Sequence, residues 1–64
     1  MRTYKVVRQK STVEGEHEFV KIWDGGDLLW ERDADSYVEV DGEMVQLSAL
    51  TDVQIIELYR NQHK

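Results

Sequence analysis

The dipeptide Asp41-Gly42 lies between two segments of alternating hydrophobicity, and it constrains the fold more than any other feature of the 64-residue sequence. Asp-Gly favours the positive φ angles of a two-residue hairpin turn. The pattern therefore predicts strands over residues 37–40 and 43–47, with Val38 opposite Val45. A slip of one residue would exchange the two faces of the hairpin, so we expect the register to be firm. The residues predicted to share the buried face are Val38, Val40, Val45 and Leu47.

A second hairpin is predicted where Gly25-Gly26 separates two runs of strong β-formers. Both glycines accept positive φ, so we expect strands over residues 18–23 and 28–32. Regular pairing places Trp23 opposite Leu28 and puts Leu29 on one face together with Val20 and Ile22. The opposite face then carries Phe19, Trp23, Leu28 and Trp30. Because both faces are apolar, this hairpin should be covered on two sides or rolled into a barrel.

A further strand is predicted over residues 3–9, followed by a polar loop over residues 10–16 or by two longer strands that meet near Glu14-Gly15. The composition of residues 33–36 is that of a turn. A helix is predicted over residues 52–62, because Thr51 and Gln54 have the spacing of a capping box. Leu50 and Ile55 are placed for a hydrophobic staple around this cap. The apolar stripe of the helix consists of Ile55, Ile56, Leu58 and Tyr59.

These elements predict a mainly β, α+β fold, with one small domain over residues 1–64. The five strands form an antiparallel meander or a small SH3-like barrel, closed by one C-terminal helix. A chain of this size buries only about 60% of the surface that it exposes when unfolded, so its stability margin is thin. The sequence contains no cysteine, which excludes disulfides and thiolate metal sites.

Charge is unevenly distributed along the chain, whose net charge is −5. Residues 1–10 hold four basic residues and no acid, whereas residues 11–43 hold eleven acids and two basic residues. No apolar run approaches the length of a membrane span or of a signal-peptide core. Together with the absence of cysteine, this predicts a cytoplasmic protein that does not bind membranes.

No residue pattern indicates catalysis, a cofactor site or a metal site. The serines and histidines match no nucleophile or acid–base signature, so we expect a protein that is not an enzyme. Two acidic clusters contain ligand-type side chains, but solvated turns are the more common role of such clusters. Their members are Glu14, Glu16, His17 and Glu18 in one cluster, and Asp33 and Asp35 in the other.

A binding role is the remaining prediction, although a core position is the commoner role for any single aromatic residue. We expect a small adaptor or inhibitor-type accessory protein, of the size and composition that phages and mobile elements often encode. Its partner is another protein or a second copy of the chain, because aromatic residues dominate binding hot spots. The predicted partner-binding residues are Phe19, Trp23, Leu28, Trp30, Tyr37 and Glu39.

Two alternatives involve nucleic acids. In the first, the basic N-terminal strand binds a nucleic acid directly, with an affinity that falls steeply as salt rises. The shortage of aromatic residues next to these basic residues disfavours this alternative. In the second, the acidic surface mimics a nucleic acid and fills the basic groove of a protein that handles one. A net charge of −5 is modest for such a mimic.

Overall fold

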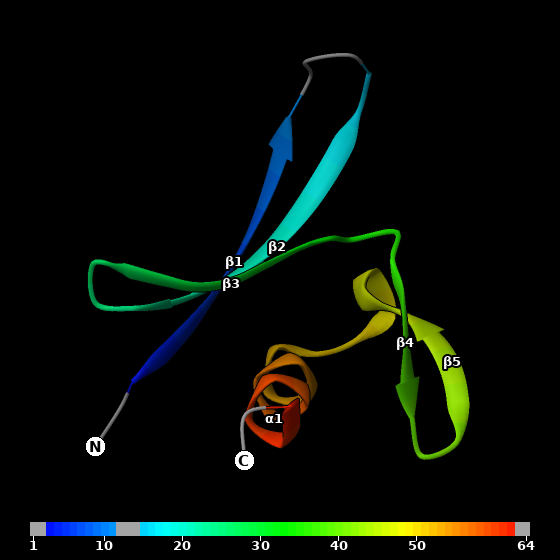
Figure 1. The fold of residues 1–64 in the computed structure, drawn as a ribbon. Coiled ribbons are helices and arrows are strands. Elements are labelled where there is room, and N and C mark those ends of the chain that lie inside the picture. Colours follow the sequence, from blue (N-terminus) through cyan, green and yellow to red (C-terminus); the bar gives the residue numbers. More distant parts are fainter. Residues whose placement is uncertain (1–2, 12–14, 63–64) are drawn as a thin grey trace.

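The computed structural model describes residues 3–11 and 15–62, and it confirms a mainly β chain with one C-terminal helix (Figure 1). The predicted strand and helix positions agree with it to within about two residues. The elements are β1 (Tyr4–Ser11), β2 (His17–Asp24), β3 (Asp27–Asp33), β4 (Tyr37–Val40), β5 (Glu43–Gln46), the 3₁₀ turn η1 (Leu47–Ala49) and α1 (Asp52–Gln62).

The strands form two separate antiparallel sheets, one with the order β1-β2-β3 and the other consisting of β4 and β5. Among the described residues they do not close into a barrel, so the open arrangement is the one observed. The turn after β3 explains the separation. The Ala34 amide donates to the Glu18 carbonyl (2.8 Å), which continues the β2–β3 pairing one residue beyond Asp33. The Asp35 amide then donates to Asp33 Oδ1 (2.9 Å) and the Ser36 amide donates to the Asp33 carbonyl (3.0 Å). These last two bonds close a turn that directs the chain away from β3 before β4 begins.

The core lies on one side of the three-stranded sheet, where α1 and the β4–β5 hairpin are packed (Figure 1). Apolar side chains from both sheets, η1 and α1 meet there, which is how a chain with only one helix covers one sheet face. The fully or nearly fully buried residues are Val20, Ile22, Trp30, Ala34, Leu47, Leu50, Ile55 and Tyr59.

The β4–β5 hairpin has the predicted register, with Val38 opposite Val45 and Val40 opposite Glu43. Asp41 and Gly42 have φ angles of 52° and 84°, as a type I′ turn requires. The predicted strand is one residue too long, because Leu47 begins η1 instead of ending β5. The Leu47 amide still donates to the Ser36 carbonyl (3.0 Å), and its side chain is fully buried as predicted.

The β2–β3 register departs from the prediction at a β-bulge. Trp23 lies opposite Leu28 as expected, but Ile22 lies opposite Trp30 rather than Leu29. Leu29 is the extra residue of the bulge, and every later residue of β3 is displaced by one position. The prediction that Trp30 shares a face with Trp23 is therefore wrong. Trp30 lies on the core face with Ile22 and retains only 5% exposure.

The turn between these strands also differs from expectation, because only Gly25 has a positive φ angle (61°). A positive φ at the first central position alone is the pattern of a type II′ turn. At the other end of the sheet, β1 and β2 are longer than predicted and pair as far as Ser11 opposite His17. The predicted turn near Glu14 falls on residues 12–14, which lie outside the described residues.

The helix begins with the predicted capping box. The Thr51 amide donates to Gln54 Oε1 (2.9 Å), and the Gln54 amide donates to Thr51 Oγ1 (3.2 Å). Leu50 and Ile55, the predicted staple, both lie in the core. The sequence did not indicate how β1 holds this end of the helix: Arg8 Nη2 donates to the Leu50 carbonyl at 2.8 Å and to Asp52 Oδ1 at 3.1 Å.

Candidate functional site

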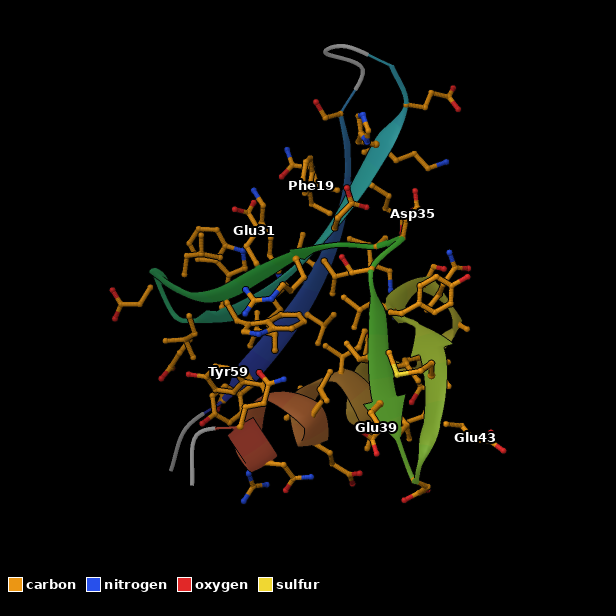
Figure 2. All side chains as sticks on the ribbon, turned by 45° about the vertical axis from the view of Figure 1, so that its right-hand side comes forward. Phe19, Glu31, Asp35, Glu39, Glu43 and Tyr59 are labelled. Atoms are coloured by element: carbon orange, nitrogen blue, oxygen red, sulfur yellow. The ribbon has the colours of Figure 1, made fainter. Side chains whose placement is uncertain are left out.

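The face of the three-stranded sheet opposite the core, here called the outer face, is the surface that the topology leaves uncovered. The register places on it Lys5, Val7 and Gln9 from β1, Phe19, Lys21 and Trp23 from β2, and Leu28 and Glu31 from β3. In Figure 2, Phe19 and Glu31 lie on the side of the sheet away from Tyr59 and α1. No helix or strand among the described residues packs on this face.

Apolar side chains form the centre of the outer face. Trp23 lies opposite Lys5 on one side and opposite Leu28 on the other. Trp23 and Phe19 are half-buried, and Leu28 is 45% exposed. Val7, which pairs with Lys21, is also half-buried. The result is an apolar strip that crosses all three strands and includes an accessible indole.

Cross-strand polar contacts hold the side chains around this strip. Lys21 Nζ donates to Gln9 Oε1 (3.1 Å) and lies 3.4 Å from Glu31 Oε2, so it links β1 to β3. Lys5 is exposed and forms no ion pair within residues 3–11 and 15–62. Its charge is therefore available beside Trp23, whereas the charge of Lys21 is compensated.

Three of the six predicted partner-binding residues meet on the outer face: Phe19, Trp23 and Leu28. Trp30 does not, because the bulge directs it into the core. The Arg32 guanidinium lies 5.0 Å from the centre of the Trp30 ring, and Trp30 Nε1 is buried without an acceptor among the described residues. Arg32 thus shields the Trp30 ring at the edge of the core.

The other two predicted residues, Tyr37 and Glu39, lie on β4 and belong to the second sheet. Tyr37 is 61% exposed, and Glu39 is also exposed and lies opposite the 64%-exposed Met44. They form a separate surface on the outside of the β4–β5 hairpin. The structure therefore divides the predicted set among two surfaces and the core.

Residues outside the six predicted partner-binding positions complete the outer face. Alternation alone puts Lys5 and Val7 on the same face of β1. What the sequence could not supply is the pairing of β1 with β2, which brings Lys5 next to Trp23. The length of the loop between these strands left that register open.

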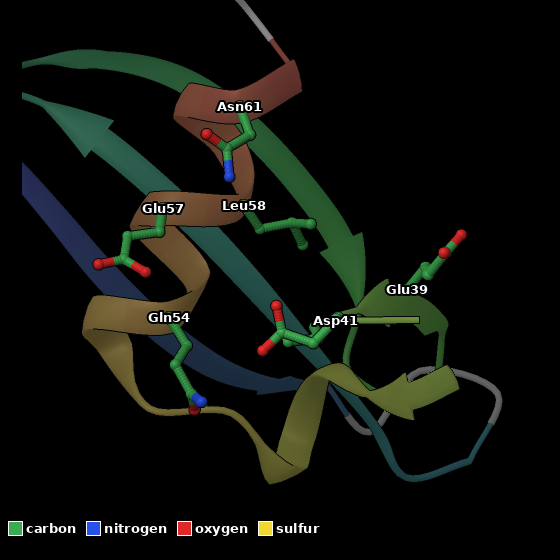
Figure 3. Close-up of a pocket in the computed structure, with 7 residues that line it drawn as sticks. Glu39, Asp41, Gln54, Glu57, Leu58 and Asn61 are labelled. Atoms are coloured by element: carbon green, nitrogen blue, oxygen red, sulfur yellow. The ribbon is translucent and has the colours of Figure 1, made fainter. Parts of the chain in front are cut away.

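A pocket of about 220 Å³ lies between α1 and the start of the β4–β5 turn (Figure 3). Asp41 points toward α1 in this view, whereas Glu39 points away from the pocket. Carboxylates and amides surround a small apolar patch, a combination that favours a positively charged group. The pocket is lined by Glu39, Val40, Asp41, Gln54, Glu57, Leu58 and Asn61.

A second pocket, of about 200 Å³, lies near the far end of the β1–β2 hairpin. It brings the two predicted acidic clusters together with one cation, and it is lined by Lys10, Glu16, His17, Glu18 and Asp35. His17 Nδ1 also lies 3.8 Å from Asp33 Oδ2. Glu14 lies outside the described residues. Within the described ranges, no group of three or more histidine or acidic side chains is arranged to hold a metal ion.

The described part of the chain contains no helix long and apolar enough to cross a membrane. Comparison of the chain with family models, with curated proteins and with solved structures finds no match.

Proposed function

We propose that this chain is a small, non-enzymatic protein-binding module that contacts its partner through the outer face of the β1–β3 sheet. The observation that carries the proposal is the position of Trp23, a half-buried indole beside the exposed Leu28 on a sheet face that no other element of residues 3–11 and 15–62 covers. Tryptophan is among the residues most enriched at binding hot spots, because its burial removes a large apolar area from water.

The shape of the molecule supports this proposal. Its radius of gyration is 12.1 Å, whereas a compact domain of this length has about 10.7 Å. Its extents are 36 × 33 × 16 Å, so it is thin in one direction. A thin, two-layered molecule exposes one face of each sheet, and here one of those faces carries Trp23 and Phe19.

The size of the outer face sets the expected strength of binding. Strands of eight residues are roughly 26 Å long, and three of them span roughly 10–15 Å, which gives a face of about 260–390 Å². A standard interface buries about 800 Å² on each partner. The outer face alone therefore suits a transient complex, and a tighter one needs contacts beyond its edges.

A capture experiment tests the proposal. The tagged chain, Trp23→Ala and Met44→Ala are compared as baits in lysate of the source cell, after circular dichroism has shown that each is folded. Met44 is the control, because it is an exposed apolar residue of β5, on the other sheet. A protein that wild type and Met44→Ala capture and Trp23→Ala loses supports the proposal. Equal capture by all three, or no capture by wild type, refutes it.

One arrangement favours a second candidate function, the binding of single-stranded nucleic acid. The β1–β2 register brings Lys5 opposite Trp23 and Gln9 opposite Phe19. Aromatic rings that stack bases beside a lysine are typical of such surfaces. Lys5→Glu is the better test variant, because Arg8→Glu would also break the contacts of Arg8 with the helix. Loss of salt-dependent oligonucleotide binding in Lys5→Glu would support this candidate.

We further propose that the protein acts in the cytoplasm, since the chain has no cysteine and its fold therefore needs no oxidising compartment to form disulfides.

A further inference from the structure

We infer that the outer edge of β1 receives an extended, acidic segment of the partner protein as a fourth strand of the β1–β3 sheet. This inference rests on the proposed protein-binding function and specifies how the partner extends its contact beyond the outer face. The outer face and the β1 edge adjoin each other, since Val7 and Lys5 belong to both. Main-chain hydrogen bonds to an edge strand are an established mode of peptide recognition.

The two edges of the sheet differ in their ability to accept a strand. β1 pairs with β2 through eight consecutive residues without irregularity, and it contains no proline. No described residue pairs with its other edge. β3 is interrupted by the bulge at Leu29, and bulges protect an edge against pairing. β1 is therefore the edge that presents a regular row of backbone groups.

The charge of β1 selects an acidic occupant. The strand holds Lys5, Arg8 and Lys10 and no acid. Arg8 already binds Asp52, and Lys10 lies opposite Glu18, so their charges are partly compensated. Lys5 has no such neighbour, because its cross-strand partner is Trp23. Carboxylates of the added strand directly opposite these positions would stabilise the complex. A second copy of β1 would instead place like charges opposite each other and destabilise it.

The pattern along β1 defines the side chains of the incoming strand. Val6 and Val7 are adjacent half-buried residues between the basic positions, and an apolar side chain opposite each would extend the core face and the outer face. An antiparallel strand opposite Lys5 to Lys10 is more stable than a parallel one. Read from Lys10 to Lys5, the complementary segment is Glu-Thr-Glu-Val-Val-Glu.

A peptide titration tests the inference. The ¹⁵N-labelled full chain is titrated with this hexapeptide, acetylated and amidated, while amide exchange along β1 is measured. We expect weak binding, slower exchange of alternate β1 amides, and much weaker binding of Lys-Thr-Lys-Val-Val-Lys. Lys5→Glu should weaken binding of the acidic peptide by about three- to tenfold, because an attractive cross-strand pair becomes a repulsive one. Arg60→Glu, which makes the same charge change on an exposed position of α1, should not.

Backbone methylation of the peptide distinguishes strand addition from other binding. In an antiparallel ladder only every second amide of the added strand points toward its neighbour. Two peptides N-methylated at adjacent positions should therefore differ, with one losing affinity and the other retaining it. Equal effects of the two methyl groups, or equal binding of the acidic and basic peptides, would overturn the inference.

Other outcomes separate this inference from the proposed function. Peptide-induced shifts at Trp23 without slower exchange in β1 would overturn strand addition and leave the outer face as the binding surface. No binding at millimolar peptide, or dimerisation of the chain through β1, would overturn the inference as well. The proposed function would still be decided by capture with Trp23→Ala.

Discussion

Replacing Arg8 by methionine should destabilise the domain by about 1.5–3 kcal/mol, because this side chain ties β1 to the start of α1. The larger part comes from the charge-assisted bond that Arg8 Nη2 donates to the Leu50 carbonyl at 2.8 Å, in a partly buried position. The ion pair with Asp52 contributes less. The side chains of Arg8 and Asp52 are 30% and 62% exposed, so solvent screens their attraction to about 0–1 kcal/mol.

The loss expected for Arg8→Met is large relative to the total stability of the domain. A domain of this length has a free energy of unfolding of roughly 3–10 kcal/mol. Urea unfolding monitored by circular dichroism measures the change, and the midpoint of thermal unfolding should fall by about 4–8 °C per kcal/mol. Methionine keeps most of the aliphatic length of arginine, so that the variant removes the guanidinium rather than the packing of the stem.

A double-mutant cycle with Asp52→Asn separates the two contacts. Asp52 also stabilises the helix through its interaction with the helix dipole. Asp52→Asn removes this interaction from wild type and from Arg8→Met alike, so it cancels in the coupling energy. We expect a coupling energy below about 1 kcal/mol, which decreases at high salt, while most of the effect of Arg8→Met persists. The reasoning is refuted if Arg8→Met is as stable as wild type, or if high salt abolishes its whole effect.

Three further substitutions test the turn, the cap and the core, each by thermal and urea unfolding. Gly42→Val should cost about 1–2 kcal/mol, because Gly42 has φ = 84°. Gly26→Ala should change stability by less than about 0.5 kcal/mol, because Gly26 has no positive φ and an added Cβ would meet open space. Equal effects of the two substitutions would contradict the turn assignments. Thr51→Ala should cost about 1 kcal/mol through loss of its bond to the Gln54 amide, and a neutral result would argue against the cap. Ile55→Ala should cost about 2–5 kcal/mol because Ile55 is fully buried, and a loss below 1 kcal/mol would mean that α1 is not docked on the sheet.

The elements that the sequence predicted correctly are those set by local chemistry. Asp41-Gly42 fixes its own turn and hence the β4–β5 register, and Thr51 with Gln54 fixes the start of α1. The candidate site depended on contacts between distant residues. Lys5 reaches Trp23 only through the β1–β2 register, and the division into two sheets depends on the turn after Asp33. Local patterns do not contain that information.

The bulge at Leu29 explains why the prediction, which assumed regular alternation along β3, placed Trp30 on the wrong face of the sheet. Burying an indole removes about 150–250 Å² from water, which is worth about 4–6 kcal/mol. Against this stand about 1 kcal/mol for an interrupted ladder bond and about 1–3 kcal/mol for the unpaired Nε1 of Trp30. Because only eight of the described residues are buried in the core, the largest side chain within reach enters the interior even though the ladder must shift by one residue.

The same bulge determines which aromatic side chains lie on the outer face. Had β3 paired regularly, both tryptophans would share that face, and replacing them together would test a binding surface. With Trp30 in the core, Trp30→Ala should cost about 3–5 kcal/mol and unfold much of the population, so that lost binding would say nothing about contact. Trp23 stands outside the core cluster, beside Leu28 and Lys5. Of the two tryptophans, Trp23 is therefore the one at which binding and folding are separable, and the proposed partner would contact the outer face there.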